Sequence, residues 1–424
     1  MNYKKLDMGS YQLHLISTDR FKTVLTRVCL RDKIVKEEIT LRNFLANFLT
    51  YSTATYKTKR ELVLKAQDLY AANIYTKVYR AGNYNMISFY LSVLSEKYTE
   101  KGMLDQSIEL LSDIMFHPNF EDEEAFQESF RFLYNATETA IQGLKEDPTL
   151  YSTVRMLECL DEDMPYSFHE HGYMEDLEKI NRETLMNYYH NVFNHSLVDI
   201  YIIGNFDEQE IIETIKKYMH FDTFKRPKES QIIYHEKLPK RIKVEKEHTD
   251  GSQSKLSIGC KIDTLDEFER NYVLTIYNFL LGSGSESKFF RIIREKHSLA
   301  YYIYSSLNKL DHLMLIRAGI SKKNFNSTVK LIKKLMKEME EGNFTEEELE
   351  VAKNNYVTFL KEIEDNESAI IETFLAKDLL NLGDIEERKK EIVKVSRDDI
   401  IKVAKKVKID TIFLLEGDVE NEGD

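Results

Sequence analysis

Several features that would place a chain in a simple class are missing from this 424-residue sequence. Tryptophan is absent, and there are only 3 cysteines, 5 prolines and 15 glycines. So little glycine and proline excludes a collagen-like or low-complexity chain. Because Cys29, Cys159 and Cys260 are far apart, no disulfide framework or Cys-x-x-Cys zinc knuckle can be read from them, and a reducing compartment is expected.

Long apolar runs and an excess of basic charge are also missing. No stretch of ~18 apolar residues exists, so no membrane span is predicted. The N-terminal residues Met1–Lys5 lack the apolar core of a signal peptide, which favours a cytoplasmic location. Lys and Arg number 59 against 72 Asp and Glu, giving a net charge of −13. A nucleic-acid-binding chain needs a basic footprint, so neither nucleic acid nor membrane is expected as a partner.

What the sequence does contain is a repeated order of elements. Thr23–Arg31 alternates apolar and polar residues as a strand does, and Glu38–Leu49 has apolar residues at helical spacing. The second half begins in the same way, with a strand-like run at Lys255–Asp263 and a helix-like run at Glu267–Leu281. Both helix-like runs end with the residues Asn-Phe-Leu or Asn-Phe-Leu-Leu. This parallel suggests that the chain arose by duplication.

The parallel continues to the end of each half. An acidic helix start follows a phenylalanine in both, and Thr345 with Glu348 predicts a capping box in the second. Each half then closes with an apolar strand ending in glycine, Ile200–Gly204 and Ile412–Gly417. We therefore predict two duplicated α+β domains, residues 1–220 and 249–424, joined by a lysine-rich linker over 221–248.

Each predicted domain is a mostly antiparallel sheet covered by helices, because helical runs lie between groups of strands and do not alternate with single strands. The polar–apolar alternation within the strands further predicts that one face of each sheet is open or lightly covered.

Common catalytic motifs are not found. Neither His-Glu-x-x-His nor His-x-x-Glu-His occurs, although paired imidazoles one helical turn apart are what such zinc sites require. His169 and His171 could chelate a metal if they lay on a strand, but Pro165 and Gly172 indicate a polar turn, and no third ligand is identifiable. The Gly282–Ser287 turn lacks the Gly-Lys-Ser/Thr ending of a phosphate loop, and it follows a helix, unlike a nucleophile elbow.

The most informative segment is Arg291–Ser305, in which a cationic helix end runs into a tyrosine-rich strand. Arg294 and Tyr301 are seven residues apart. If the helix ends near His297, both side chains can point toward the same edge of the sheet. A guanidinium and a phenol there could hydrogen-bond a peptide carbonyl and stabilise an oxyanion. The alternative is that Arg294 forms a surface ion pair and Tyr301 packs in the core.

This segment resembles the second-domain motif of the insulinase/pitrilysin/mitochondrial processing peptidase superfamily. The likeness lies in Gly284–Ser305, which includes Arg294-Glu295-Lys296 and Leu299-Ala300-Tyr301, and in Gly172 followed by Glu175-Asp176-Leu177. The resemblance covers nearly the whole chain and implies the superfamily's pair of duplicated α+β domains. Active members carry His-x-x-Glu-His on a helix that corresponds to residues 40–53 here, and this chain lacks that motif.

The resemblance therefore implies a zinc-less half of a heterodimer, similar to YmfF-type subunits that accompany a zinc-bearing YmfH-type partner. Arg294 and Tyr301 fall on the positions that contact peptide substrate and would be both its catalytic and its substrate-binding residues. No metal or cofactor is expected in this chain; zinc is expected in the partner. Metalloendopeptidase activity would then exist only in the complex, with an implied link to modification of elongation factor P.

Three interpretations remain on sequence grounds. The first is the half-site peptidase subunit just described. The second is an inactive scaffold or regulatory interaction protein of the same fold, which the missing zinc motif favours and which could form a homodimer. The third is an unrelated metal or ligand function through His169 and His171.

Overall fold

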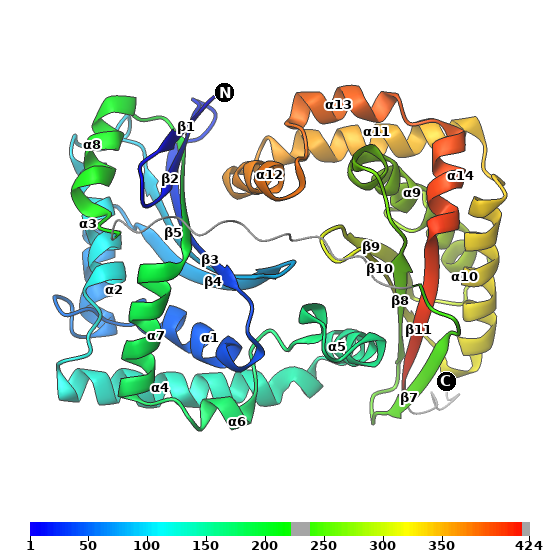
Figure 1. Ribbon diagram of the computed structural model, residues 1–424, viewed down its shortest axis with the longest axis horizontal. Helices are drawn as coiled ribbons and strands as arrows, with labels where there is room; N and C mark the ends of the chain where they lie inside the picture. The colour runs from blue at the N-terminus through cyan, green and yellow to red at the C-terminus, as the bar shows by residue number, and fades with distance from the viewer. Residues whose placement is uncertain (222–237, 418–424) are drawn as a thin grey trace, which may run out of the picture. The chain divides into compact units, whose positions relative to one another are not determined.

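A computed structural model describes residues 1–221 and 238–417, which group into two compact units (Figure 1). The first unit contains residues 1–143, 169–221 and 367–371, and the second contains residues 144–168, 238–366 and 372–417. Most of the predicted linker, residues 222–237, lies outside the described residues. No helix in the described ranges is long and apolar enough to cross a membrane.

The first unit is built on a six-stranded sheet with the order β1-β2-β6-β3-β5-β4, in which only the β2–β6 pair is parallel. Its elements are β1 (Asn2–Asp7), β2 (Gln12–Ser17), β3 (Thr23–Lys33), α1 (Ile39–Leu49), α2 (Lys59–Asp68), β4 (Asn73–Ala81), β5 (Tyr84–Leu94), α3 (Met103–Phe116), α4 (Glu123–Gln142), α6 (Met174–Leu177), α7 (Arg182–His195), β6 (Leu197–Gly204) and α8 (Glu208–Tyr218).

The second unit is built on a five-stranded sheet with the order β7-β11-β8-β10-β9, in which only the β7–β11 pair is parallel. Its elements are α5 (Pro148–Leu160), β7 (Lys243–His248), β8 (Ser254–Ile262), π-helix η4 (Glu269–Val273), α9 (Leu274–Leu281), π-helix η5 (Phe289–Lys296), β9 (Tyr302–Asn308), β10 (Leu313–Ile320), α10 (Phe325–Glu340), α11 (Glu346–Ile363), α13 (Ile385–Val393), α14 (Arg397–Lys406) and β11 (Val407–Glu416). Helix α12 (Glu367–Leu380) begins in residues of the first unit and continues in the second.

The two sheets have the same topology, which confirms the predicted α+β fold with mostly antiparallel sheets. Without β1, the first sheet reads β2-β6-β3-β5-β4, and the second matches it strand for strand as β7-β11-β8-β10-β9. Even the single parallel pair is at the same place in both. This agreement supports the duplication inferred from the sequence.

Matching capping residues start matching helices in the two units. Asn181 accepts a hydrogen bond from the Thr184 N–H at the start of α7, and Ser396 does the same for Asp399 at the start of α14. Both are capping boxes, which satisfy backbone donors that a helix leaves unpaired in its first turn. The box predicted at Thr345 and Glu348 opens α11 and is confirmed.

The prediction of an open or lightly covered sheet face is wrong for the central strands. Every residue of β6 is buried, and so is most of β3. In the second unit the reason is helix α5, which follows the first unit's helices in the chain but packs on the second sheet. Met156 and Leu160 of α5 form an apolar cluster with Leu313, Phe413 and Leu415 of that sheet.

A glycine allows α5 to approach the second sheet closely. A Cβ atom added at Gly259, in the middle of β8, would lie 2.7 Å from the Met156 sulfur and 2.9 Å from Leu160 Cδ1. Distances this short are not tolerated in packed interiors, so a larger residue would displace the helix. Periodicity within β8 alone gives no sign of this long-range packing.

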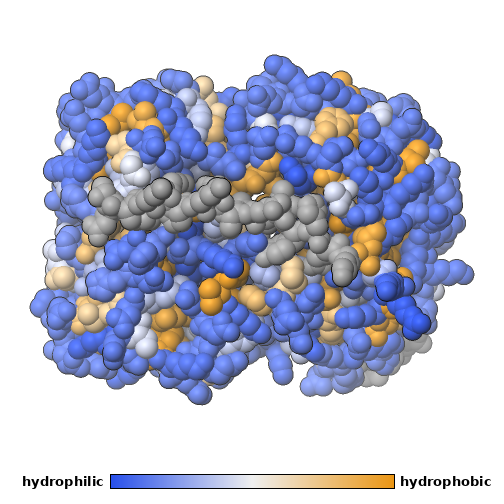
Figure 2. Space-filling view, in the orientation of Figure 1, coloured by the Kyte–Doolittle hydropathy of each residue, from blue (hydrophilic) through white to orange (hydrophobic). Residues whose placement is uncertain are grey.

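The corresponding face of the first sheet is polar and equally buried. The Arg31 guanidinium on β3 donates to Asp199 on β6 at 2.8 Å, and His14 Nε2 lies 3.4 Å from the other carboxylate oxygen. All three side chains are at most 1% exposed. Charged groups are buried only when they are paired, so this cluster is a fixed feature of the first sheet. On the outside, the face drawn in Figure 2 is mostly hydrophilic, with apolar residues in small separate patches.

Candidate functional site

Helix α1 occupies the place where the resemblance expects a zinc-binding motif, and its side chains do not fit a metal. A His-x-x-Glu-His motif places its groups at i, i+3 and i+4, and on α1 Asn43, Ala46 and Asn47 have this spacing. The Asn43 amide donates to the carbonyl oxygens of Ile39 at 2.9 Å and Glu170 at 2.8 Å. Amides and a methyl group cannot replace the imidazoles and carboxylate that bind zinc and activate water.

The loop around His169 and His171 is held against the start of α1. Thr40 Oγ1 accepts the Tyr173 N–H at 2.8 Å and donates to the Tyr173 carbonyl at 3.3 Å. Gly172, with a φ of +84°, lies so close that an added Cβ would be 2.0 Å from Thr40 Oγ1. The glycine is therefore required by this contact, which explains the Gly172 segment without a metal.

The two histidines of this loop do not form a metal centre. The His169 ring stacks on Tyr173 with centroids 4.8 Å apart. Across the described parts of the chain, no three His, Cys, Asp or Glu side chains come together in a way that could hold a metal ion. The structure thus gives no support to a function through His169 and His171.

Arg294 lies in the last turn of π-helix η5, which ends at Lys296 with His297 as its C-cap. The guanidinium carbon lies over the Phe290 ring, 4.7 Å from its centroid, and Nε is 3.7 Å from the Glu295 carboxylate. The side chain is 42% exposed. π-helical turns are rare and are frequently found at functional sites. Arg294 is thus oriented by an aromatic face while its N–H groups stay accessible.

Tyr301 immediately precedes β9 and is also exposed, at 50%. Its N–H donates to the Gly319 carbonyl on β10 at 2.8 Å, which fixes its backbone at the sheet edge. Between η5 and Tyr301, Ser298 adopts a left-handed conformation with a φ of +50°. Such a conformation is uncommon for serine and makes the chain turn sharply from helix to strand. Of the alternative interpretation, the surface ion pair of Arg294 is found, with Glu295, whereas the packing of Tyr301 in the core is wrong.

The structure thus places Arg294 and Tyr301 on two ends of one short turn in the second unit, both accessible. The turn is held by the Leu299 N–H, which donates to the Ile293 carbonyl at 3.0 Å. Arg294 offers up to five N–H donors and Tyr301 one hydroxyl, while neither is a metal ligand here. Chemically, the pair can hold a carbonyl or carboxylate oxygen by hydrogen bonds.

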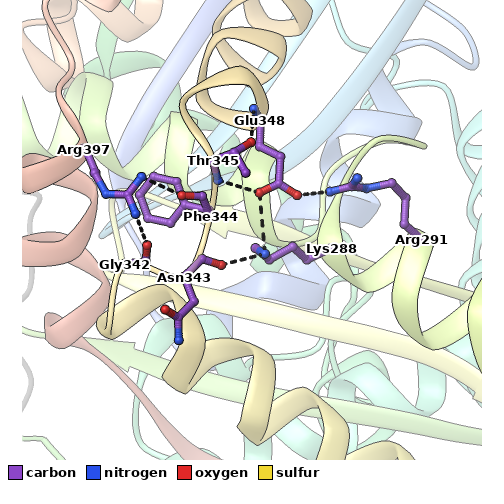
Figure 3. A network of polar contacts seen from close by, with 8 residues as sticks. All are labelled: Lys288, Arg291, Gly342, Asn343, Phe344, Thr345, Glu348 and Arg397. Atoms are coloured by element: carbon purple, nitrogen blue, oxygen red, sulfur yellow. Dashed lines mark hydrogen bonds and ion pairs between the residues drawn. The ribbon is translucent and has the colours of Figure 1, made fainter.

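A network of polar contacts fixes η5 to the start of α11 (Figure 3). Arg291 of η5 forms an ion pair with the Glu348 carboxylate. Lys288, the N-cap of η5, lies 3.7 Å from the same carboxylate. Lys288 also donates to the Asn343 carbonyl at 3.0 Å. Burial alone would raise the pKa of Glu348, but the Thr345 N–H and the two cations hold it below its ordinary value.

The turn before α11 is fixed from the other side by Arg397 of α14 (Figure 3). Arg397 donates to the carbonyls of Phe344, at 2.6 Å, and Gly342, and its guanidinium lies over the Phe344 ring. Gly342 has a φ of +76°, and an added Cβ would lie 2.8 Å from Ile401. These contacts link residues from three separate stretches of sequence, 288–291, 342–348 and 397–401, so only the capping box among them could be foreseen.

Lys309 is another residue whose pKa is shifted in the folded protein, and the sequence gave no indication of it. It follows β9, and its Nζ donates to the Asn271 carbonyl at 2.7 Å. Burial, together with the nearby Arg388 and Arg270, lowers the pKa of Lys309 to about 7. An amine near this value is partly neutral at physiological pH, unlike an ordinary lysine. Lys309 could be recognised as unusual only from its proximity to Arg270 and Arg388, and these three cations come together only in the folded chain.

Comparison with known proteins agrees with this geometry. Residues 179–356 match the family model described as the peptidase M16 inactive domain. The probable inactive metalloprotease YmfF of Bacillus subtilis is 27% identical over 423 residues, covering 98% of each chain. A conserved protein from Enterococcus faecalis has a TM-score of 0.89 at 24% identity over 100% of both chains. The peptidase M16 inactive domain from Pseudomonas fluorescens has a TM-score of 0.80 at 15% identity over 100% of both chains.

The likenesses to YmfF and to the two solved structures extend over nearly the whole length, whereas the family model matches residues 179–356. The likeness to the solved structures shows the two-unit fold, and helix α1 of this chain contains no histidine, cysteine or carboxylate that could bind zinc. The chain is thus similar to the peptidase M16 inactive domain over residues 179–356 and to YmfF over nearly its whole length, and its helix α1 contains no zinc-binding motif.

Proposed function

We propose that this chain is the zinc-less subunit of a two-chain M16 peptidase, in which Arg294 and Tyr301 hold the backbone of a peptide substrate. The observation that carries the proposal is the accessibility of both side chains at one turn, 42% for Arg294 and 50% for Tyr301. A scaffold has no need to keep an arginine and a tyrosine exposed beside a π-helix. The partner subunit, carrying His-x-x-Glu-His, would supply zinc, the attacking water and the general base.

In this proposal the chain's own residues bind and orient the substrate. Arg294 donates hydrogen bonds to the carbonyl oxygen next to the scissile bond, and the Tyr301 hydroxyl donates to the oxyanion that forms there. Donors aimed at a developing charge stabilise the transition state more than the substrate. The Glu348 network supports the function indirectly, because it fixes η5 and so the direction of Arg294.

The first test is the mass in solution of this chain alone and mixed with an M16-type protein from the same organism that carries His-x-x-Glu-His. A 1:1 complex near twice the 50.0 kDa subunit mass supports the proposal. A chain that stays a monomer or homodimer in the mixture favours the second interpretation, an inactive scaffold or regulator. The missing metal ligands on α1 are the observation in favour of that interpretation.

The second test is peptide hydrolysis by the assembled pair. Arg294→Ala and Tyr301→Phe should each lower kcat/KM about 100-fold, the loss typical of a removed oxyanion donor. Lys296→Ala is the matched control, because Lys296 is an exposed cation of the same helix. Unchanged hydrolysis by Arg294→Ala in an intact complex would contradict the proposed role.

The link with elongation factor P rests on the family resemblance alone. If it holds, a strain lacking this chain should show altered modification of that factor by mass spectrometry. Restoring the Arg294→Ala chain would then show whether the Arg294 site is involved.

A further inference from the structure

The second unit has a basic groove that is lined by neither Arg294 nor Tyr301. It has a volume of about 350 Å³ and lies between the segment that leads into β7, helix α10 and the start of β11. Its apolar lining comes from Ile242, Met336 and Ile409, of which Ile242 is 41% exposed. The groove therefore offers apolar contact as well as charge, which a plain solvated surface does not.

Cations dominate the walls of this groove. Of the lining residues that the structure describes, five are Lys or Arg and a single one, Glu340, is acidic. Both carboxylate oxygens of Glu340 are already paired, with Lys337 at 2.9 Å and with Lys408 at 2.6 Å. Among the described residues, Lys240, Arg241 and Lys333 have no carboxylate within ion-pair distance. In a chain of net charge −13, this local positive excess calls for an anionic ligand.

The lining distinguishes between classes of anion. Among the described residues, no aromatic side chain lines the groove, whereas surfaces that bind single-stranded nucleic acid stack bases on aromatic rings. Apolar side chains below a cationic rim instead suit a ligand that carries both carboxylates and aliphatic groups. An acidic peptide segment has this combination.

The neighbouring strand favours an extended conformation for such a peptide. β7 pairs with β11 on one side and is the edge strand of the second sheet (Figure 1). Five of its six residues are exposed, including Val244 at 50%. Edge strands bind extended peptides through backbone hydrogen bonds, while alternate side chains enter pockets beside them.

From these observations we propose that the groove formed by Lys240, Arg241, Ile242, Lys333 and Met336 binds an extended acidic peptide segment of a partner protein. Its carboxylates pair with the three unpaired cations, and its alternate aliphatic side chains lie on Ile242 and Met336. The site is independent of Arg294 and Tyr301, so it stands whether or not the chain is part of a peptidase.

The test measures fluorescence anisotropy of a short labelled peptide in which glutamate alternates with leucine, titrated with the full chain. We expect saturable binding that weakens as the salt concentration rises from about 50 to 300 mM, because salt screens exposed charges. Peptides in which lysine replaces glutamate, or serine replaces leucine, should bind more weakly. Binding of the lysine peptide as tight as that of the glutamate peptide overturns the proposal.

Charge-reversing variants locate the site. Arg241→Glu with Lys333→Glu should weaken binding about tenfold, since each exposed pair contributes modestly. The matched control is Arg60→Glu with Lys216→Glu, which reverses the same two charge types on exposed residues of the first unit. All four positions are exposed, so circular dichroism should show that both double variants fold.

Two outcomes would overturn the proposal. Equal weakening by the groove variant and the control would show binding by overall charge alone. Displacement of the peptide by an oligouridylate at equal or lower concentration would assign the groove to nucleic acid.

Discussion

The two sheets of this protein share a strand order, but the faces that lie opposite their main hydrophobic cores differ: the first is organised around a buried ion pair, and the second around an apolar cluster under α5. In the first sheet the face holds the buried Arg31–Asp199 ion pair, at 2.8 Å, with both side chains 1% exposed. At the corresponding place in the second sheet, Lys261 lies 3.8 Å from Asp410, and both are about ten times as exposed, 11% and 9%. Helix α5 covers this face with an apolar cluster around Leu313 and Phe413, and its Ser152 and Thr153 hydrogen-bond Ser257 and Arg317. A duplicated fold can thus keep its backbone while it changes which forces hold each copy.

The largest expected effect comes from breaking these two ion pairs. Asp199→Asn leaves Arg31 and His14 buried without their carboxylate, and we expect a loss of about 3–5 kcal/mol in the free energy of unfolding. Asp410→Asn should cost about 1 kcal/mol or less, because that pair is longer and partly solvated. Urea denaturation of both variants measures the difference. Equal losses would contradict the contrast between the faces.

Lowering the pH should change the stability of the two units in opposite directions through one glutamate in each, Glu269 and Glu38. Burial alone would raise the pKa of Glu269 in η4, but Lys402 and Lys406 lower it to about 2 from 4.5. The stabilisation is therefore complete above pH 4.5 and is lost as the pH falls toward 2. In the first unit, burial raises the pKa of Glu38 despite Arg42. Ionised Glu38 therefore lowers the free energy of unfolding at neutral pH, and this destabilisation is relieved as the pH falls.

We expect Glu269→Gln to cost about 2 kcal/mol at pH 7 and much less at pH 3, where the wild-type carboxylate loses part of its own advantage. Glu38→Gln should cost nothing at pH 7 or stabilise the protein slightly. Chemical denaturation at both pH values compares the variants. A Glu269→Gln effect that does not change with pH would refute the assignment.

Adding a side chain under α5 should destabilise the protein more than the corresponding substitution in the first sheet. Gly259→Val forces a side chain into Met156 and Leu160, for an expected loss of about 1–3 kcal/mol. Cys29 has the corresponding position in β3, where a buried side chain is already accommodated. Cys29→Val should therefore cost about 1 kcal/mol or less. Thermal unfolding measures both, and a larger effect for Cys29 would show that the first face is the tighter one.

The smallest expected effect concerns the helix starts that correspond in the two units. Glu348→Gln removes a charge that joins α11 to Arg291 and Lys288, and should cost about 1 kcal/mol. In the first unit, Asp122 caps α4 and pairs with the exposed Lys57, so Asp122→Asn should change the melting temperature less. Glu347→Gln, one residue away from the network, is the neutral control.

How far the sequence predicted this structure depends on the range of each interaction. Strands β3 and β8, the helices after them and the Thr345 capping box follow from local patterns, and all are confirmed. Local patterns could not predict that η4 and η5 are π-helices, because the extra residue per turn is decided by tertiary packing. They also failed for the sheet faces, since the helix that covers the second sheet lies about a hundred residues upstream in the chain.

For the candidate site too, residues close together in the sequence could be predicted and contacts between distant segments could not. Arg294 and Tyr301 could be predicted as a pair because they lie in one short segment; the structure shows both exposed, and their role stays a prediction. Lys309 was missed, because its lowered pKa requires Arg270 and Arg388, which come from elements far apart in sequence. The Glu348 network was also missed beyond its cap, since three of its contacts join separate helices and turns.

The position of α5 has a consequence for how the chain is made. During synthesis α5 leaves the ribosome before the strands that it covers, so Met156 and Leu160 have no apolar partner until β8 and β11 have been made. A gene cut within residues 222–237 would leave this helix on one fragment and its sheet on the other. Each fragment alone should aggregate, and only their joint expression should give a folded protein. The duplicated halves have become dependent on each other and are no longer separable modules.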